Sequence, residues 1–389
     1  MEVGVVGKPN VGKSTFFKAL TLADAEIAAF PFTTIKANVG VGYVKSRCPC
    51  GEFKVQCSPK NGLCVGGSRF TPIKIIDVAG LVPGAHEGKG LGNQFMDDLR
   101  QADALVHVVD VSGRTDDRGE ACEGHDPELD VRFLEDEINL WFAGIIGKNW
   151  GKIRGKVQHG NAKVVRELTE QLSGLQVTEA HVKKALTETG LGDKLDWGEE
   201  DINAFAVRLR GISKPILIAA NKIDLGGENY ERLKEKYGMI PVCAEAELAL
   251  READAHGMIE YTPGEAGFTV KGELQEKQAK ALEFVSERIL KRYGSTGVQE
   301  CLNKAVYEVL DLITVYPVEN EGKLADGKGN VLPDSFLMPR GSTTLDLAYK
   351  VHSDIGDKFI GAVDCRTKQK VGRDHELKDC DVIKIIAGR

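Results

Sequence analysis

The sequence GKPNVGKS, residues 7–14, fits the pattern G-x-x-x-x-G-K-[ST]. The residues before it, EVGVV (2–6), are typical of a short buried strand, and STFFKALTLA (14–23) has helical periodicity. A glycine-rich loop between a strand and a helix can surround phosphate oxygens with backbone N–H groups, and the helix N-terminus adds a positive dipole. We therefore expect Lys13 to reach the β- and γ-phosphates and the Ser14 hydroxyl to coordinate Mg²⁺. The predicted phosphate-binding residues are Asn10, Val11, Gly12, Lys13, Ser14 and Thr15.

A second strand pattern ends in an acidic residue that suits the same site. The segment PIKIID (72–77) is followed by Val78-Ala79-Gly80. An aspartate at the end of such a strand, here Asp77, can hold Mg²⁺ through water, and the N–H of Gly80 can approach a γ-phosphate. The motif D-x-x-G is weak alone, but its place after a strand and downstream of the phosphate loop strengthens it.

A third segment carries base-recognition chemistry. The strand pattern PILIAA (215–220) runs into Asn221-Lys222-Ile223-Asp224. The carboxylate of Asp224 can accept hydrogen bonds from N1–H and the exocyclic amine of guanine, a donor pair that adenine lacks. IPVCA (240–244) predicts a short strand, and the backbone of Cys243-Ala244 is placed to contact the guanine O6. The predicted ligands are thus GTP and GDP, bound with Mg²⁺ through Asn221, Lys222, Asp224, Cys243 and Ala244.

Composition limits the class of protein. The 389 residues are 42% hydrophobic and 28% charged, which is typical of a soluble chain of two to four domains. The net charge of −7 argues against a protein whose whole surface binds nucleic acid but permits a local basic patch. No apolar run approaches the about 18–20 residues of a membrane span, and the N-terminus MEVGVVG lacks a basic signal region. We therefore expect a cytoplasmic protein with reduced thiols and with neither a membrane nor DNA as partner.

A helical segment interrupts the nucleotide-binding pattern. Helical periodicity dominates from 128 to about 210, between the strand patterns 104–111 and 215–220, so this block is inserted within the nucleotide domain. Its basic residues cluster in 148–166, near Trp141 and Trp150. Two interpretations stay open: the segment binds RNA phosphates with a tryptophan stacking on a base, or it is a solvated helix face with both tryptophans in the core. The basic residues are Lys148, Lys152, Arg154, Lys156, Lys163 and Arg166.

Four of the nine cysteines gather in one short segment. Cys48, Cys50, Cys57 and Cys64 form C-x-C-x₆-C-x₆-C in an expected insertion, residues 46–70. Four soft sulfur ligands suit tetrahedral Zn²⁺, although C-x-C is a less usual spacing than C-x₂₋₄-C. The alternatives are a metal or redox site and four reduced thiols that cap a hairpin.

The C-terminal part changes character twice. Helices are expected at 273–291 and 297–312. From 313 the pattern becomes β–β–α–β–β and ends in the strand DVIKIIAG (381–388), which predicts a small β-grasp domain.

These motifs together resemble the P-loop GTPases of the translation-factor-related class. FPFTTI (30–35) resembles switch I of the Obg branch, and AGLVPGAHEGKGLGNQF (79–95) resembles switch II of the YchF, or Obg-like ATPase, family. PRGSTTLDLAYKVH (339–352) is similar to the signature of the TGS domain. The resemblance is strongest to archaeal YchF-type proteins. It implies that Thr34 senses Mg²⁺ and that the TGS domain contacts the ribosome or RNA, with a regulatory or purely structural role as the alternative. The basic segment 148–166 is a second candidate contact on the ground of its charge.

Two departures from the family matter for function. YchF proteins of the bacterial and animal type, which prefer ATP, carry Asn-x-x-Glu where this chain has Asn221 to Asp224, so we expect GTP. Leu81 occupies the position of a water-orienting glutamine, which implies slow hydrolysis, and Asn10 resembles residues that help to bind a stimulating K⁺. The expected function is a GTP-hydrolysing switch, with an ATPase or a non-catalytic RNA-binding protein as alternatives. The expected catalytic residues are Lys13, Thr34, Gly80 and Asn10, and the expected Mg²⁺ ligands are Ser14, Thr34 and Asp77.

The expected architecture is an α/β P-loop domain with an inserted helical arm and a C-terminal β-grasp. The boundaries are a nucleotide domain at 1–115 and 210–270, a helical insertion at 116–209, connecting helices at 271–312 and a TGS-like domain at 313–389.

Overall fold

The computed structural model describes residues 1–21, 38–80, 92–160, 163–192 and 194–388. By its contacts the chain forms two compact units. The first consists mainly of Met1–Ala19 and Lys74–Cys301, and the second mainly of Val41–Ile73 and Leu302–Arg389. None of the described helices combines the length and apolar character that crossing a lipid bilayer requires.

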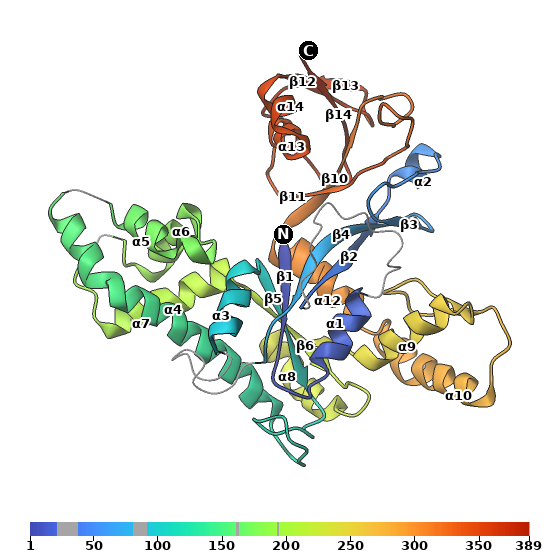
Figure 1. The fold of residues 1–389 in the computed structure, drawn as a ribbon, viewed down its shortest axis with the longest axis horizontal. Coiled ribbons are helices and arrows are strands. Elements are labelled where there is room, and N and C mark those ends of the chain that lie inside the picture. Colours follow the sequence, from blue (N-terminus) through green and yellow to red (C-terminus); the bar gives the residue numbers. More distant parts are fainter. Residues whose placement is uncertain (22–37, 81–91, 161–162, 193, 389) are drawn as a thin grey trace. The chain divides into compact units, whose positions relative to one another are not determined.

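A seven-stranded sheet carries the phosphate-binding segment (Figure 1). Its order is β2-β4-β1-β5-β6-β7, with β3 paired to β4. The pairs β1–β4, β1–β5, β5–β6 and β6–β7 are parallel, and β3–β4 is antiparallel. Parallel strands that run as unbroken apolar segments are buried on both faces, and every residue of β5 is buried accordingly. The strands are β1 (Glu2–Val6), β2 (Val39–Arg47), β3 (Leu63–Val65), β4 (Ser68–Asp77), β5 (Ala104–Asp110), β6 (Ile216–Asn221) and β7 (Ile240–Pro241).

Helices follow the strands of this sheet in the order expected of a P-loop domain. Helix α1 begins at Lys13, directly after the phosphate loop, and α9 begins at Ala244, directly after the predicted base loop. The strand expected at 240–244 is shorter in the structure, because Cys243 already stands at the N-terminal cap of α9. The helices are α1 (Lys13–Thr21), α2 (Cys50–Phe53), α3 (Gly92–Gln101), α8 (Gly227–Tyr237) and α9 (Ala244–Ala255).

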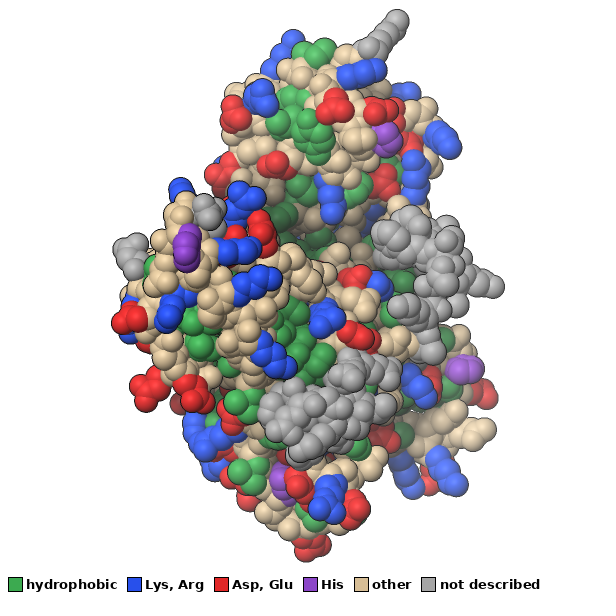
Figure 2. Space-filling view, turned by 60° about the vertical axis from the view of Figure 1, so that its left-hand side comes forward, with side chains coloured by type: hydrophobic (Ala, Val, Ile, Leu, Met, Phe, Trp, Pro, Cys, Tyr) green, Lys and Arg blue, Asp and Glu red, His purple; other side chains and the backbone are tan. Residues whose placement is uncertain are grey.

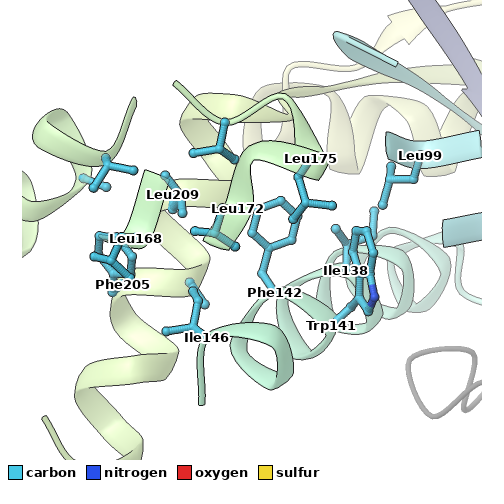
Figure 3. Packing of buried hydrophobic residues seen from close by; sticks show 14 of the residues in the cluster. Leu99, Ile138, Trp141, Phe142, Ile146, Leu168, Leu172, Leu175, Phe205 and Leu209 are labelled. Carbon is cyan, nitrogen blue, oxygen red and sulfur yellow. The ribbon is translucent and has the colours of Figure 1, made fainter. Parts of the chain in front are cut away.

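Between β5 and β6 the described residues form four α-helices, as the periodicity predicted. The longest, α4, is capped by the Asp126 side chain, which accepts a hydrogen bond from the N–H of Glu128. Its apolar face packs with α5 to α7 around Phe142, Leu172 and Phe205 (Figure 3). The helices are α4 (Pro127–Gln158), α5 (Val164–Leu172), α6 (Glu179–Thr189) and α7 (Glu199–Ser213), with a short 3₁₀ turn η2 (Ser173–Leu175).

Two helical segments and a small hairpin lie between the sheet domain and the C-terminal strands. Both segments pass into π-helical turns, so each expected helix is interrupted. The elements are β8 (Ile259–Glu260), β9 (Thr269–Val270), α10 (Glu276–Val285), η3 (Ser286–Leu290), α11 (Lys291–Tyr293), α12 (Val298–Lys304) and η4 (Ala305–Val309).

The C-terminal residues form the predicted β-grasp. A five-stranded mixed sheet, in the order β11-β10-β14-β12-β13, is joined by two helices. The Thr343 side chain caps α13 by accepting from the Asp346 N–H. The elements are β10 (Leu312–Val318), β11 (Phe336–Pro339), α13 (Thr344–Val351), α14 (Ser353–Asp357), β12 (Phe359–Asp364), β13 (Gln369–Val371) and β14 (Val382–Ala387).

The cysteine-bearing segment belongs to the second unit. The sequence pattern placed residues 46–70 as an insertion of the nucleotide domain, but contacts group Val41–Ile73 with the C-terminal residues. One example is the ion pair of Glu52 with Arg366, in which Nε lies 2.6 Å from the carboxylate. Partners more than three hundred residues apart carry no local sequence signal, so this grouping could not be predicted.

Candidate functional site

A cavity of about 630 Å³ lies where the phosphate loop and the two predicted base loops meet. Most of the predicted ligands line it, although they come from segments more than two hundred residues apart. Lys8, Pro9, Leu225 and Glu245 also line the cavity and were not predicted. The predicted residues in its wall are Asn10, Gly12, Lys13, Ser14, Thr15, Gly80, Asn221, Lys222, Asp224, Cys243 and Ala244.

Asn221 joins three of the loops around this cavity. Its Nδ2 donates to the carbonyl of Val11 at 2.8 Å, and its Oδ1 accepts from the N–H of Ala244 at 3.0 Å. The Val11 side chain is fully buried, so this residue contributes through its backbone. Gly12 has a φ of +93°, and a Cβ there would lie 2.3 Å from Asn221 Nδ2. Only glycine therefore allows the phosphate loop to approach Asn221 this closely.

Lys222 ties the base loop to the phosphate loop and to β5. Its backbone is left-handed, with a φ of 61°, and its Nζ donates to the Asn10 carbonyl at 3.0 Å. The same ammonium contacts Asp110 at 2.7 Å. Burial tends to raise the pKa of Asp110, but hydrogen bonds from Lys222 and Ser112 outweigh it and leave that pKa below its ordinary value. Asp110 therefore stays ionised and supports the loop. Its place at the end of a predicted strand was the one signal that could have identified it.

Asp224 and Cys243 stand together in the part of the wall formed by the base loops. The Cys243 thiol donates to the Asp224 carboxylate, with sulfur and oxygen 3.7 Å apart. Burial, reinforced by the charge of Asp224, raises the pKa of Cys243 to about 12, so the thiol stays protonated at neutral pH. The Ala244 N–H, expected to contact the guanine O6, already donates to the Asn221 Oδ1. The O6 atom of a bound guanine would therefore have to share this N–H with Asn221 or displace Asn221 from it.

At the phosphate end of the cavity, the lining residue Lys13 forms an ion pair with Asp77, which does not itself line the cavity. Both side chains are largely buried, at 14% and 25% exposure. Gly80 adjoins the phosphate loop, because a Cβ there would lie 3.8 Å from the Gly7 carbonyl oxygen. The remaining predicted residues at this end, Thr34 and Leu81, lie outside the residues that the structure describes.

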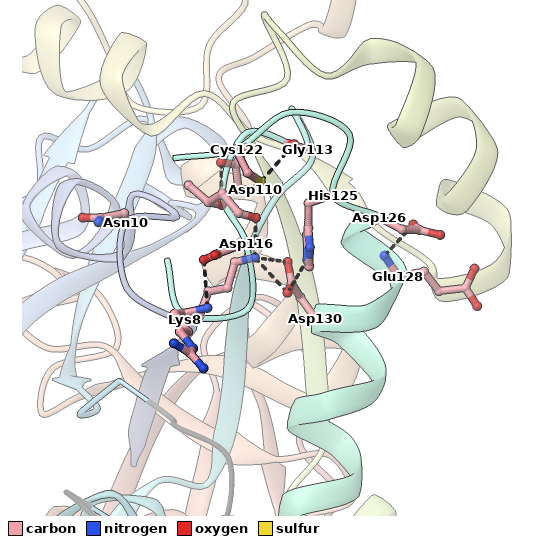
Figure 4. A network of polar contacts seen from close by, with 12 residues as sticks. Lys8, Asn10, Asp110, Gly113, Asp116, Cys122, His125, Asp126, Glu128 and Asp130 are labelled. Carbon is pink, nitrogen blue, oxygen red and sulfur yellow. Dashed lines mark hydrogen bonds and ion pairs between the residues drawn. The ribbon is translucent and has the colours of Figure 1, made fainter. Parts of the chain in front are cut away.

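A polar network around Lys8 connects the phosphate loop with helix α4 and with the segment that precedes it (Figure 4). Lys8 Nζ lies 2.7 Å from the Asp130 carboxylate and donates to the Thr115 carbonyl at 2.8 Å. His125 Nε2 also contacts Asp130, at 2.9 Å. Asn10, predicted to help K⁺ binding, donates from its Nδ2 to the Gly119 carbonyl at 2.9 Å.

The four clustered cysteines are brought together in the second unit. Their Sγ atoms all lie within 4.8 Å of one another. The C-x-C-x₆-C-x₆-C spacing, although unusual, is therefore compatible with a single four-sulfur site.

In the basic segment of the helical block, the charged side chains are exposed but the nearby tryptophans are buried. Its lysine and arginine side chains are exposed, and Figure 2, which turns this block forward, shows many such side chains (blue) there. Trp141 and Trp150, however, are 9% and 5% exposed, and Trp150 stacks on Trp197 with ring centroids 3.9 Å apart. Stacking of either tryptophan on an RNA base is therefore wrong for this conformation, because both rings are used in the core.

Comparison with known proteins agrees with the site. Residues 2–134 match a family model described as 50S ribosome-binding GTPase, and residues 322–387 match the TGS domain. Residues 219–320, which hold the base motif, match the G4 motif-containing domain of an Obg-like, YGR210-like GTPase.

Several relatives cover nearly the whole chain, among them two GTP-binding proteins and a ribosome-binding ATPase. An uncharacterized GTP-binding protein of Methanocaldococcus jannaschii is 50% identical over 99% of this chain and 98% of its own. The crystal structure of a GTP binding protein from Pyrococcus horikoshii is 42% identical, covers both chains fully and has a TM-score of 0.82. The ribosome-binding ATPase YchF of Buchnera aphidicola is 28% identical over 99% of this chain and 98% of its own. With its P-loop sheet, inserted helices and C-terminal TGS domain, the chain belongs to the YchF/Obg-like family of P-loop GTPases.

Proposed function

We propose that the chain binds GTP and GDP with Mg²⁺ and acts as a slowly hydrolysing molecular switch. The observation that carries the proposal is that Asp224 and Lys13 line one cavity. A carboxylate for guanine and an ammonium for phosphates are then available to a single nucleotide. Two relatives that cover nearly the whole chain are named GTP-binding proteins, which supports the same class of ligand.

The Lys13–Asp77 ion pair gives the site a built-in response to phosphate. Phosphate oxygens compete with Asp77 for the Lys13 ammonium, so nucleotide binding releases the Asp77 carboxylate. The oxygen atoms of Ser14 and Asp77 suit Mg²⁺, which prefers hard ligands and keeps several of its waters. The ion would neutralise charge on the β- and γ-phosphates. Thr34 is proposed as a further Mg²⁺ ligand from switch I.

Hydrolysis is proposed to be slow, with Lys13, Gly80, Asn10 and Thr34 at the reacting phosphate. Leu81, in the place of a glutamine, cannot orient water. A K⁺ at Asn10 would use the side-chain oxygen, since the amide nitrogen already donates to Gly119. Positive charge near the bridge between the β- and γ-phosphates stabilises the charge that develops there.

The partner is proposed to be the ribosome or RNA in the cytoplasm. Relatives in the family are named ribosome-binding, and the exposed basic segment 148–166 offers charges for phosphate contacts. The TGS domain is the second proposed contact.

A fluorescence titration with GTP, GDP, ATP and ADP, each with Mg²⁺, tests the nucleotide. We expect a preference for guanine of about a hundredfold, equivalent to about 2.7 kcal/mol. Asp224→Glu should abolish it, while Asp117→Glu, an exposed aspartate outside the cavity, should leave it unchanged. Equal or tighter binding of ATP by the unmodified protein would overturn the assignment in favour of an ATPase.

Single-turnover hydrolysis tests the switch. GTP cleavage that increases with K⁺ or with ribosomes supports it. Tight GTP binding without cleavage under all these conditions would instead identify a non-catalytic ribosome- or RNA-binding protein that uses nucleotide as a structural ligand.

A further inference from the structure

Four cysteines of the second unit have the spacing of metal ligands. The Sγ atoms of Cys48 and Cys57 are 3.9 Å apart, and those of Cys50 and Cys64 are 3.8 Å apart. A tetrahedral ion with metal–sulfur bonds of about 2.3 Å requires sulfur atoms about 3.8 Å from one another. Disulfide sulfurs, in contrast, lie about 2.05 Å apart. The sulfur atoms are therefore spaced for one shared ion.

The chain segment that carries these thiols is packed into the C-terminal unit. Cys48 and Cys50 are buried in one apolar cluster with Tyr316 of β10 and with Leu332. Beyond the cluster, the backbone N–H groups of 58 and 60 donate to the carbonyls of 331 and 333, both at 2.9 Å. An ion held by the cysteines would thus fix the segment that supports residues 331–333.

A buried arginine is paired across the β3–β4 strands with one of these cysteines and has no acidic partner among the described residues. Arg69 is fully buried and is the direct cross-strand partner of Cys64 in the β3–β4 pair, so both side chains share one face. Its guanidinium donates to the carbonyls of Leu332 and Pro333, each at 3.0 Å. Among the described residues no carboxylate forms an ion pair with it. A buried cation without a counter-charge is costly.

The missing charge is the one that a metal centre would supply. Four thiolates around one Zn²⁺ carry a net charge of −2, because each thiol gives its proton to solvent when the ion binds. A dianionic centre that includes Cys64 would lie on the same face of the β3–β4 pair as Arg69, where its charge would compensate the guanidinium and Arg69 would in turn stabilise the thiolates. The four sulfurs and the unpaired cation are separate observations that point to the same ligand.

We propose that Cys48, Cys50, Cys57 and Cys64 bind one structural Zn²⁺, with Arg69 as a positioning residue that links this centre to residues 332–333. The site is independent of nucleotide. All its ligands come from the protein, so it has no open position for substrate and its role is to stabilise the C-terminal unit. A mononuclear ion fits better than an iron–sulfur cluster, which would hold its thiolates farther apart.

Metal analysis of the full-length protein tests the proposal directly. We expect one equivalent of zinc per chain after purification, lost in Cys57→Ser and retained in the control Cys122→Ser, a half-buried cysteine outside the cluster. Titration of the metal-free protein with Co²⁺ should give the visible absorption of a tetrahedral thiolate site. Protein without zinc that also gives no such absorption, or a Cys57→Ser variant with full zinc content, would overturn the proposal, as would iron in place of zinc.

Two further measurements separate the role of Arg69 from a general folding defect. Arg69→Met should weaken zinc retention against a chelator by 10- to 100-fold, the usual effect of removing a residue that supports metal ligands. Chelation should also speed amide exchange at Val331 and Leu332 without changing nucleotide affinity. Unchanged exchange and unchanged retention would show that the ion does not fix this segment.

Discussion

The Lys8 ammonium of the phosphate loop and the Asp130 carboxylate of α4 form a buried ion pair, 2.7 Å apart, with side chains only 5% and 7% exposed. The pair connects the nucleotide site with the first helix of the inserted block, and His125 shares the same carboxylate. A movement of the phosphate loop that displaced Lys8 would leave Asp130 buried beside His125 alone. The phosphate loop and the start of α4 are therefore expected to move together.

Removing one partner of this pair should destabilise the protein strongly. We expect Lys8→Met to lower the free energy of unfolding by about 3–5 kcal/mol, because it leaves a buried carboxylate without its cation. Chemical denaturation measures the change. A double variant, Lys8→Met with Asp130→Leu, should recover part of the loss, since neither buried charge then remains.

An exposed pair in the same block is the matched control. Arg208 and Glu188 are ion-paired at 46% and 34% exposure. Arg208→Met should cost at most about 1 kcal/mol because water screens such pairs. If Lys8→Met cost no more than this control, the buried pair would not hold α4 to the phosphate loop.

Acid should destabilise the sheet domain through His107 of β5. Burial, with a smaller contribution from the Lys8 charge, lowers the pKa of His107 to about 3. The unfolded chain, with a histidine pKa of about 6.5, binds the proton more tightly, so this contribution to stability is present above pH 6.5 and is lost as the pH falls toward 3. Between pH 7 and pH 5 the loss from this one group is about 2 kcal/mol.

The variant His107→Leu isolates this effect. The Nδ1 atom of His107 is buried without a hydrogen-bond partner among the described residues. An apolar side chain in its place should therefore lower the free energy of unfolding only slightly at pH 7. As the pH falls, the free energy of unfolding of the parent should therefore decrease more than that of the variant. A difference that stayed constant from pH 7 to pH 5 would contradict the assignment.

The close approach of Gly12 to Asn221 predicts a sharp loss of nucleotide affinity in Gly12→Ala. The new Cβ would lie 2.3 Å from Asn221 Nδ2 on a backbone with a φ of +93°, so both the phosphate loop and the base loop must shift. We expect affinity for GDP to fall at least about a hundredfold, or 2.7 kcal/mol.

Gly144→Ala serves as the control for that change. Gly144 lies within α4, and a Cβ there meets nothing within 4 Å. This variant should bind GDP normally and gain up to about 1 kcal/mol in stability, because alanine favours the helix. Similar GDP affinity in both alanine variants would show that the Gly12 contact does not control the site.

The site residues that could be predicted from the sequence belong to short motifs, whereas those that were missed depend on partners far away in the chain. Lys13 and Asp224 were predictable because each belongs to a short motif whose chemistry is complete within a few residues of a strand end. Asp130 was not, since an aspartate in the first turn of a helix is ordinary until the fold brings Lys8 to it. Arg69 was missed for the same reason, because its partners lie about 260 residues away in the chain.

The tryptophans of the helical block give the last prediction, because their two interpretations differ in what a substitution should do. Trp150 is 5% exposed and stacks on Trp197 at an interplanar angle of 14°, so Trp150→Ala should cost about 3–5 kcal/mol of stability. Lys152→Glu, on the exposed side of the same helix, should change stability by less than about 0.5 kcal/mol.

If the basic segment contacts RNA, the same lysine variant should weaken RNA binding and reduce its salt dependence by about one charge. Trp150→Phe keeps an aromatic ring in the core and should bind RNA as the parent does. Loss of RNA affinity in a stably folded Trp150→Phe variant, with Lys152→Glu unaffected, would mean that the tryptophan leaves the core to stack on a base and that the exposed lysines are only a solvated face.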